Sequence, residues 1–314
     1  MHGHSLDTAS ALIGSALSGV LSRLVCHPLD TLKSKLQYDN GSSFSGTLDA
    51  LYKTYASDGI RGFYRGLGVA IIGGAPGVCL YLSSYDTCKD LLIKNSYFMA
   101  ANPFVSYLCS GMIAEACSCL VFVPVDVIKE RLQVKIRISS SFAPSNKETA
   151  PMYRGSYDAM RQIFRHEGLK GLYKGYGVTL LAYGPFSAIY FLSYEYLKKA
   201  VVDRRSSSSD PSFGEALLCS AAAGAFASFT TNPLDLVKLR MQVHRGQLKG
   251  QQVTLDERRY QNMLSSFRTI LSEEGYTGFF RGSTARILFH IPNVAITMSG
   301  YEWCKNYCKK VLAD

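Results

Sequence analysis

Charged residues that could form ion pairs between helices recur three times at one spacing in this 314-residue sequence. Each set follows a proline, with an aspartate two residues after it, a lysine five residues after it and a glutamine nine residues after it. The prolines are Pro28, Pro124 and Pro233. The three sets are Asp30, Lys33 and Gln37; Asp126, Lys129 and Gln133; and Asp235, Lys238 and Gln242.

The aspartate and the lysine of each set lie near one face of a helix, because they are separated by about one turn. A proline inside a long helix kinks it, and three kinked helices around an axis can pair the aspartate of one with the lysine of the next. We therefore predict a ring of three ion pairs at one end of a helical bundle, with the glutamines adding hydrogen bonds. The alternative is that these are solvated charges at helix ends, worth about 0 to 1 kcal/mol each.

A second motif, Tyr-acidic-x-x-Lys, also occurs three times. Its residues are Tyr85, Asp86 and Lys89; Tyr194, Glu195 and Lys198; and Tyr301, Glu302 and Lys305. These residues can form a second ring at the other end of the bundle. Two rings that open and close in turn would give alternating access to a central site, provided that substrate contacts compensate for each opening.

The motifs belong to a repeat of about 100 residues, so the chain is one structural unit used three times. An acidic-glycine pair stands 27 residues before each of the three tyrosines. The pairs are Asp58-Gly59, Glu167-Gly168 and Glu274-Gly275, and each is followed by an aromatic-basic-glycine triplet ending at Gly66, Gly175 or Gly282. We place the repeats at residues 1–100, 101–208 and 209–314 of a single membrane domain.

Hydropathy is compatible with six long helices that show lipid on one side and a wet cavity on the other. The chain is 47% hydrophobic, and no stretch reaches the twenty uninterrupted apolar residues of a simple transmembrane span. Such half-apolar helices can be drawn at about 8–38, 67–94, 103–136, 176–201, 212–243 and 283–312. We therefore predict an all-α membrane protein.

Other classes of protein fit the sequence less well. The net charge of +10 is spread through the repeats without a recognised nucleic-acid module, so we expect no nucleic-acid partner. The nine cysteines lack the paired spacing of a zinc site, and no phosphate-binding loop, cofactor motif or nucleophile-base pair is present. We expect no metal, no cofactor and no enzyme activity. A non-transporting membrane scaffold remains an alternative, although the ring charges that such a protein would lose are all retained.

Together, the four repeated motifs resemble the signature of the mitochondrial carrier family over essentially the whole chain. The resemblance implies six tilted transmembrane helices in three pseudosymmetric repeats, three short amphipathic matrix helices, and transport of a small solute across the mitochondrial inner membrane by a monomer. It pairs Asp30 with Lys129, Asp126 with Lys238 and Asp235 with Lys33 in a matrix ring. In a cytoplasmic ring it pairs Asp86 with Lys198, Glu195 with Lys305 and Glu302 with Lys89.

The same resemblance implies that cardiolipin phosphates bind at helix N-termini, where free amides and the positive end of the helix dipole favour an anion. The glycines expected at these sites are Gly66, Gly155, Gly175 and Gly282. An aromatic-x-glycine motif completes the site as Phe44-Ser45-Gly46 and Tyr153-Arg154-Gly155, but the third repeat has Tyr260-Gln261-Asn262.

Substrate contacts are expected where the repeats disagree, because a transported solute is not threefold symmetric. Glu115 stands where the other repeats have Gly19 and Gly224, and Arg23 stands where they have Cys119 and Ser228. These opposite charges at midmembrane depth either bind the substrate or pair with each other. The contact points that the family implies on the even helices are Gly73, Gly74, Ala182, Tyr183, Phe289 and His290.

These even-helix contact points carry neither Arg nor Lys, which argues against a multiply charged anion. An acid, a base, a histidine and aromatic faces suit a zwitterion or a cation with a flat ring. Locally, residues 64–68, 75–77 and 115–121 resemble the S-adenosylmethionine carrier subgroup, which typically has Asp at Arg23 and Arg-Glu at Ala182-Tyr183. Mitoferrin-like iron carriers are the rival, although Arg23 and Val78 replace their metal-binding histidines.

Overall fold

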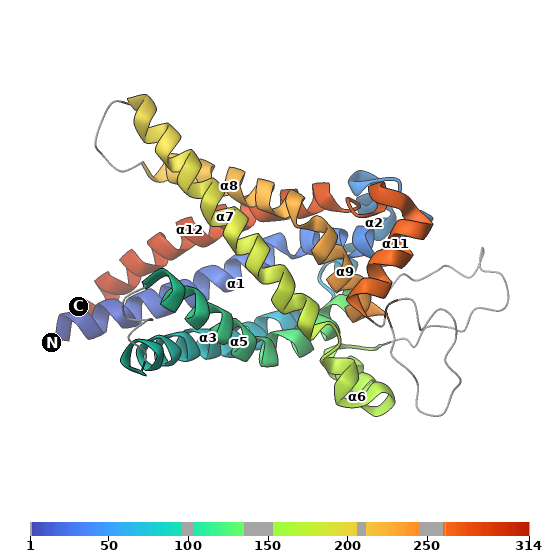
Figure 1. Ribbon diagram of the computed structural model, residues 1–314, viewed down its shortest axis with the longest axis horizontal. Coiled ribbons are helices and arrows are strands. Elements are labelled where there is room, and N and C mark those ends of the chain that lie inside the picture. Colours follow the sequence, from blue (N-terminus) through green and yellow to red (C-terminus); the bar gives the residue numbers. More distant parts are fainter. Residues whose placement is uncertain are drawn as a thin grey trace. The chain divides into compact units, whose positions relative to one another are not determined.

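The computed structural model describes residues 2–95, 103–134, 153–205, 212–244, 260 and 262–313, and the regular structure in these ranges is helical throughout. Seven helices cover the six segments that the sequence predicts as membrane helices, and Figure 1 labels them. They are α1 (His2–Tyr38), α3 (Leu67–Asn95), α5 (Pro103–Gln133), α7 (Tyr176–Arg205), α8 (Phe213–Thr230), α9 (Asn232–Val243) and α12 (Ser283–Ala313). The short helices are α2 (Thr47–Phe63), α6 (Ser156–Leu172) and α11 (Met263–Gly278).

The chain divides into two compact units. The first comprises Met1–Lys53, Pro185–Asn232 and Phe280–Asp314, and the second comprises Thr54–Gly184 and Pro233–Phe279. In the first unit α1 and α12 run side by side in opposite directions, and α8 packs against α12 (Figure 1). In the second unit α3 packs along α5, and α6 packs against α5.

Prolines lie inside the long helices as the sequence predicts, but the expected helix over 212–243 is wrong in one respect. It is divided at Thr231 into α8 and α9. Pro233 lies two residues later and has no N–H to continue the helix, while the Thr231 N–H and hydroxyl both donate to the Ala227 carbonyl, at 3.0 and 2.7 Å. Of the described helices, three are long and apolar enough to cross a membrane by length and composition, namely Leu67–Asn95, Cys109–Gln133 and Phe213–Thr230.

Each short helix bends at the glycine of its acidic-glycine pair. Gly59, Gly168 and Gly275 have φ of 63°, 69° and 67° with ψ of −163°, −161° and −167°. A positive φ with an extended ψ is essentially restricted to glycine. The recurrence of this unusual backbone at equivalent positions shows that the sequence repeat is also a structural repeat.

The acid of the pair ties the short helix to the long helix before it. In the second repeat Arg131 of α5 donates to both oxygens of Glu167 on α6, at 2.5 and 2.9 Å. Arg240 of α9 contacts Glu274 of α11 in the same bidentate way. These side chains are at most 5% exposed, so each pair is a permanent anchor rather than a solvated surface contact.

We predict that Glu167→Gln lowers the free energy of unfolding by about 3 to 5 kcal/mol, because it leaves the buried Arg131 guanidinium without its charge partner. Thermal unfolding of the purified protein in detergent measures this loss. The matched control is Lys53→Gln, which breaks the Lys53–Asp49 pair on α2, where the lysine side chain is 51% exposed, and should change stability far less. Equal losses in the two variants would contradict the anchoring role.

Candidate functional site

Asp126 of α5 and Lys238 of α9 form an ion pair at the predicted matrix ring. The Lys238 Nζ lies 2.8 Å from the Asp126 Oδ2, and the two side chains are 16% and 26% exposed. They follow Pro124 and Pro233 by two and five residues, so α5 and α9 meet at this pair just beyond the two prolines. The other expected pairs, Asp30–Lys129 and Asp235–Lys33, join residues of different units and stay predictions.

The three glutamines of the ring motif are completely buried: Gln37, Gln133 and Gln242. The Gln37 amide donates to the Asn232 Oδ1 at 3.2 Å, and Asn232 in turn donates to the Arg281 carbonyl at 3.2 Å. Sequence analysis missed Asn232, which is fully buried directly before Pro233. The available signal was that the repeats disagree at this position, where the other two have His27 and Val123.

The glycines of the aromatic-basic-glycine triplets lie at junctions between successive repeats. Their φ values of 81°, 82° and 71° favour glycine, and a Cβ would also come within 2.8 to 3.1 Å of the next repeat. The approaches are Gly66 to Lys129, Gly175 to Gln242 and Gly282 to Gln37. Packing against the ring motif of the following repeat therefore requires these glycines, and their lipid contacts stay a prediction.

The basic residue of the triplet bonds the end of the next ring-motif helix in two of the repeats. Lys174 donates to the His244 carbonyl beyond α9 at 2.7 Å, and Arg281 donates to the Asp39 carbonyl beyond α1 at 3.4 Å. A cation there satisfies carbonyls and opposes the negative end of the helix dipole. In the first repeat, Arg65 contacts Asp58 of its own acidic-glycine pair at 2.7 Å.

A pocket of about 410 Å³ in the first unit lies at the starts of α2 and α12. Phe44, Gly46, Arg281 and Gly282 are among its lining residues. Two helix N-termini and a guanidinium give this pocket the chemistry of an anion site. It brings together the two motifs that sequence analysis associated with lipid phosphate.

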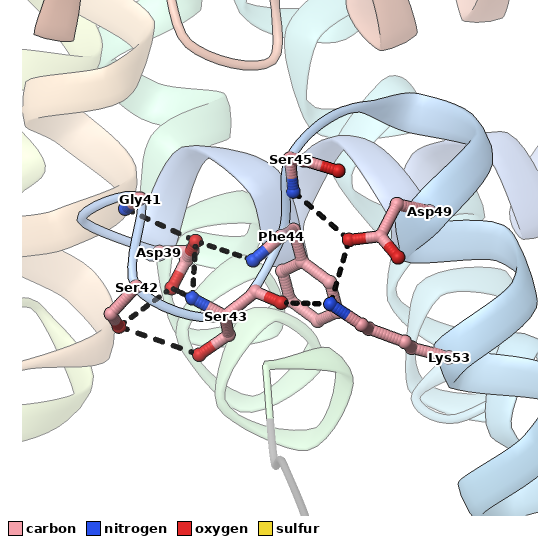
Figure 2. Close-up of polar contacts among 8 residues, drawn as sticks. All are labelled: Asp39, Gly41, Ser42, Ser43, Phe44, Ser45, Asp49 and Lys53. Carbon is pink, nitrogen blue, oxygen red and sulfur yellow. Dashed lines mark hydrogen bonds and ion pairs between the residues drawn. The ribbon is translucent and has the colours of Figure 1, made fainter.

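The loop beside this pocket is held by two carboxylates, as Figure 2 shows. Asp39 accepts the backbone N–H groups of Gly41, Ser43 and Phe44, each at 3.1 Å. Asp49 accepts from the Lys53 ammonium at 2.8 Å and from the Ser45 N–H at 2.9 Å, and these bonds lower its pKa. The loop is therefore ordered before any ligand binds.

The equivalent positions of the other repeats differ. A Cβ on Gly155, at the start of α6, would meet no atom within 4 Å. Asn262 replaces this glycine at the start of α11, where its N–H donates to the Ser265 hydroxyl at 3.1 Å. The third repeat thus begins its short helix with a polar cap instead of the aromatic-x-glycine motif.

In the first unit, the predicted contact residue His290 lies among aromatic rings. Its ring is stacked on Phe186 of α7 at 5.4 Å between centroids and meets the edge of Phe289 at 5.4 Å. The Arg286 guanidinium lies over the Phe186 ring, 5.7 Å from the ring centroid. Sequence analysis missed Phe186, although its place directly after Pro185 could have indicated it. Arg23 of α1 is partly exposed in the same unit.

In the second unit, Glu115 of α5 is partly exposed, and its carboxylate accepts a hydrogen bond from the Cys119 thiol at 3.5 Å. Gly74 is buried, and a Cβ on Gly73 would overlap Val125, so α3 approaches α5 closely at these contact points. Ala182 and Tyr183 are in α7, and Tyr183 is 40% exposed. Arg23 and Glu115 are in different units, and their predicted roles stay predictions.

Residues of the predicted cytoplasmic ring lie near the ends of α3 and α7. Tyr85 stacks on Tyr81, and Tyr194 stacks on Tyr190, each with ring centroids 6.3 Å apart. Asp86 and Glu195 are exposed, whereas Lys89 and Lys198 are partly buried. The side chains of Tyr301, Glu302 and Lys305 lie outside the described part of the structure, and the pairings of this ring stay predictions.

Comparison with known proteins supports the architecture. The profile described as mitochondrial carrier protein matches residues 4–96, 100–205 and 209–312. Mitochondrial substrate carrier family protein E of Dictyostelium discoideum is 32% identical over 309 residues, 96% of each chain. Mitoferrin of the same organism is 30% identical over 97% of each chain. Putative mitochondrial carrier protein PET8 of Eremothecium gossypii is 32% identical over 93% of this chain and 96% of its own.

The helical fold with three matched repeats defines a six-helix membrane transporter, and the chain belongs to the mitochondrial carrier family. It is a multi-pass protein of the mitochondrial inner membrane that moves small metabolites and is not an enzyme. The predicted fold class and family are confirmed. The resemblance to the S-adenosylmethionine subgroup stays a hypothesis.

We predict that Asp126→Lys lowers the thermal stability of the purified carrier by about 1 to 3 kcal/mol, because two lysines then face each other in a partly buried site. Adding Lys238→Asp should restore much of the loss, since it re-forms the pair in reverse. Lys33→Asp in the Asp126→Lys background is the matched control and should not restore it. Rescue by Lys33→Asp alone would show that the pairing is wrong.

Proposed function

We propose that this carrier transports a small organic metabolite with a cationic or zwitterionic head and a flat ring, S-adenosylmethionine being the first candidate. The observation that carries this proposal is a ladder of aromatic rings on α7. Phe186, Tyr190 and Tyr194 stack in succession with centroids 6.3 Å apart and interplanar angles of 10° and 8°. Such faces favour adenine by stacking and a sulfonium by cation-π attraction.

Glu115 is the proposed partner for the positive end of the substrate. Its carboxylate accepts from a thiol, which is a weak donor and uses one of about four acceptor sites. A substrate ammonium or sulfonium could therefore approach the same carboxylate. Arg23, if it is not paired with Glu115, would take the substrate carboxylate.

The Asp126–Lys238 pair supports alternating access as the mechanism. Its side chains are partly exposed, so water can solvate both charges when the helices separate, and opening costs less than it would in a dry interior. We propose that this pair and its counterparts close the matrix side. Substrate contacts at the centre would compensate for opening the ring.

The pocket beside Arg281 and Gly282 is proposed to hold a cardiolipin phosphate. Two helix N-termini and a guanidinium converge there, and loop order reduces the entropy lost on binding. This proposal gives the lipid a role in holding α2 and α12 together.

Ferrous iron is the second candidate substrate, because two mitoferrins are among the relatives. His290 and Glu115 could serve as ligands for iron in transit. Within the described ranges no group of three or more His, Cys, Asp or Glu side chains could hold a metal ion together. An organic cation is therefore placed first.

We predict that liposomes containing the purified carrier take up labelled S-adenosylmethionine faster than labelled ADP or citrate. A micromolar ligand needs about 8 kcal/mol, and the aromatic and polar contacts proposed above would each supply about 1 kcal/mol or more. Uptake of ferrous iron without uptake of S-adenosylmethionine would identify iron as the substrate instead. Rapid exchange of citrate or ADP would contradict both candidates.

Glu115→Gln is predicted to weaken substrate affinity about tenfold or more, because a hydrogen bond to a charged group is worth about 1.5 to 3 kcal/mol. The glutamine keeps the shape of the side chain, so folding should persist. Ligand-induced thermal stabilisation measures the affinity. Asp203→Asn removes an exposed carboxylate near the end of α7 and serves as the control. Unchanged affinity in Glu115→Gln would exclude this residue from the site.

A further inference from the structure

An apolar stripe recurs on all three short helices at the same distance before the bending glycine, and all three of its side chains are exposed on α2 and on α6. Its members are Leu48, Leu51 and Tyr55 on α2 and Tyr157, Met160 and Phe164 on α6. The equivalent residues on α11 are Leu264, Phe267 and Leu271, of which Phe267 packs partly buried against the core. The spacing of three and four residues places each trio on one face. On α6 the three side chains are 73%, 42% and 56% exposed.

The inward face of α6 is a different face of the helix. Ala159 and Ile163 are 0% and 1% exposed and pack in a core cluster with α5 residues such as Val127. Asp158 steadies the first turn by accepting the Arg154 N–H at 2.8 Å and the Gln162 amide at 2.9 Å. The Arg154 N–H is the main reason that the pKa of Asp158 is lowered. The apolar stripe is therefore held outward by packing on the other side.

A basic stripe runs beside the apolar stripe on α6. Arg161 and Arg165 are one turn apart and exposed, and Lys170 is exposed beyond the bend. The nearby acid Glu167 is 5% exposed and bound to Arg131, so it does not neutralise this surface. At the position of Arg165, the other repeats have Ala56 on α2 and Ser272 on α11.

We propose that α6 is a binding surface for acidic phospholipid, with the apolar stripe inserted at the bilayer interface and Arg161 and Arg165 on the lipid phosphates. A helix with adjacent apolar and basic stripes binds such an interface through buried apolar area and attraction to anionic headgroups. The second arginine distinguishes α6 from α2 and α11. This surface is on the side of α6, whereas the cardiolipin phosphate is proposed at the N-termini of α2 and α12 beside Arg281.

Site-specific tryptophan quenching tests the proposal, because the chain has a single tryptophan. In a Trp303→Phe background, Phe164→Trp places a reporter on α6, and Leu271→Trp places a matched reporter on α11. Each protein is reconstituted into vesicles containing either brominated phosphatidylglycerol or brominated phosphatidylcholine at the same mole fraction. Tyr157→Trp provides a second α6 reporter if Phe164→Trp disturbs folding.

We expect the α6 reporter to be quenched more strongly by the acidic lipid than by the zwitterionic lipid. Each basic residue near an anionic membrane surface strengthens binding to that surface by about fivefold. The double variant Arg161→Gln with Arg165→Gln should therefore abolish the difference in quenching between the two lipids. The α11 reporter should show a smaller difference. Thermal unfolding in detergent verifies that the variants remain folded.

Three outcomes would overturn the proposal. Equal quenching of the α6 reporter by both lipids would mean that the surface meets the bilayer without selecting acidic headgroups. A preference that survives removal of both arginines would place the selectivity elsewhere. No quenching by either lipid would mean that another partner, such as a protein, covers the apolar stripe.

Discussion

The structure depends on the close approach between one glycine of each repeat and the ring-motif helix of the next repeat. At Gly66, Gly175 and Gly282 the backbone has a positive φ and a Cβ would crowd Lys129, Gln242 and Gln37. The helices α3, α7 and α12 start at these three junctions. The helix that each glycine contacts carries charges of the matrix ring. Backbone packing at these glycines therefore helps to position those charges.

Burial separates the two kinds of ion pair that the repeats contain. Arg131 and Glu167 are bidentate and at most 5% exposed, whereas Asp126 and Lys238 are 26% and 16% exposed. Breaking the first would leave charges in a dry interior, while opening the second exposes charges that water already reaches. Similar chemistry can therefore anchor a helix in one place and suit a reversible gate in another.

The repeated spacing predicted the helical class and the family, because the motifs recur at the same separation in every repeat. It did not predict the division at Thr231, where the N–H and the hydroxyl of Thr231 bond the Ala227 carbonyl and Pro233 lies two residues later. Arg131 and Arg240 were also missed, although a basic residue recurs at this position as Lys35 in the first repeat. Their importance depends on acids more than thirty residues away.

By itself the sequence determined that this is a threefold-repeated carrier of the mitochondrial inner membrane, since motif spacing survives any uncertainty about packing. Only the tertiary structure decided that the triplet glycines are packing residues, that Phe186 meets His290, and that Asn232 links Gln37 to Arg281. These contacts join residues that are distant in the chain. Their partners depend on how the helices pack, which no local pattern encodes.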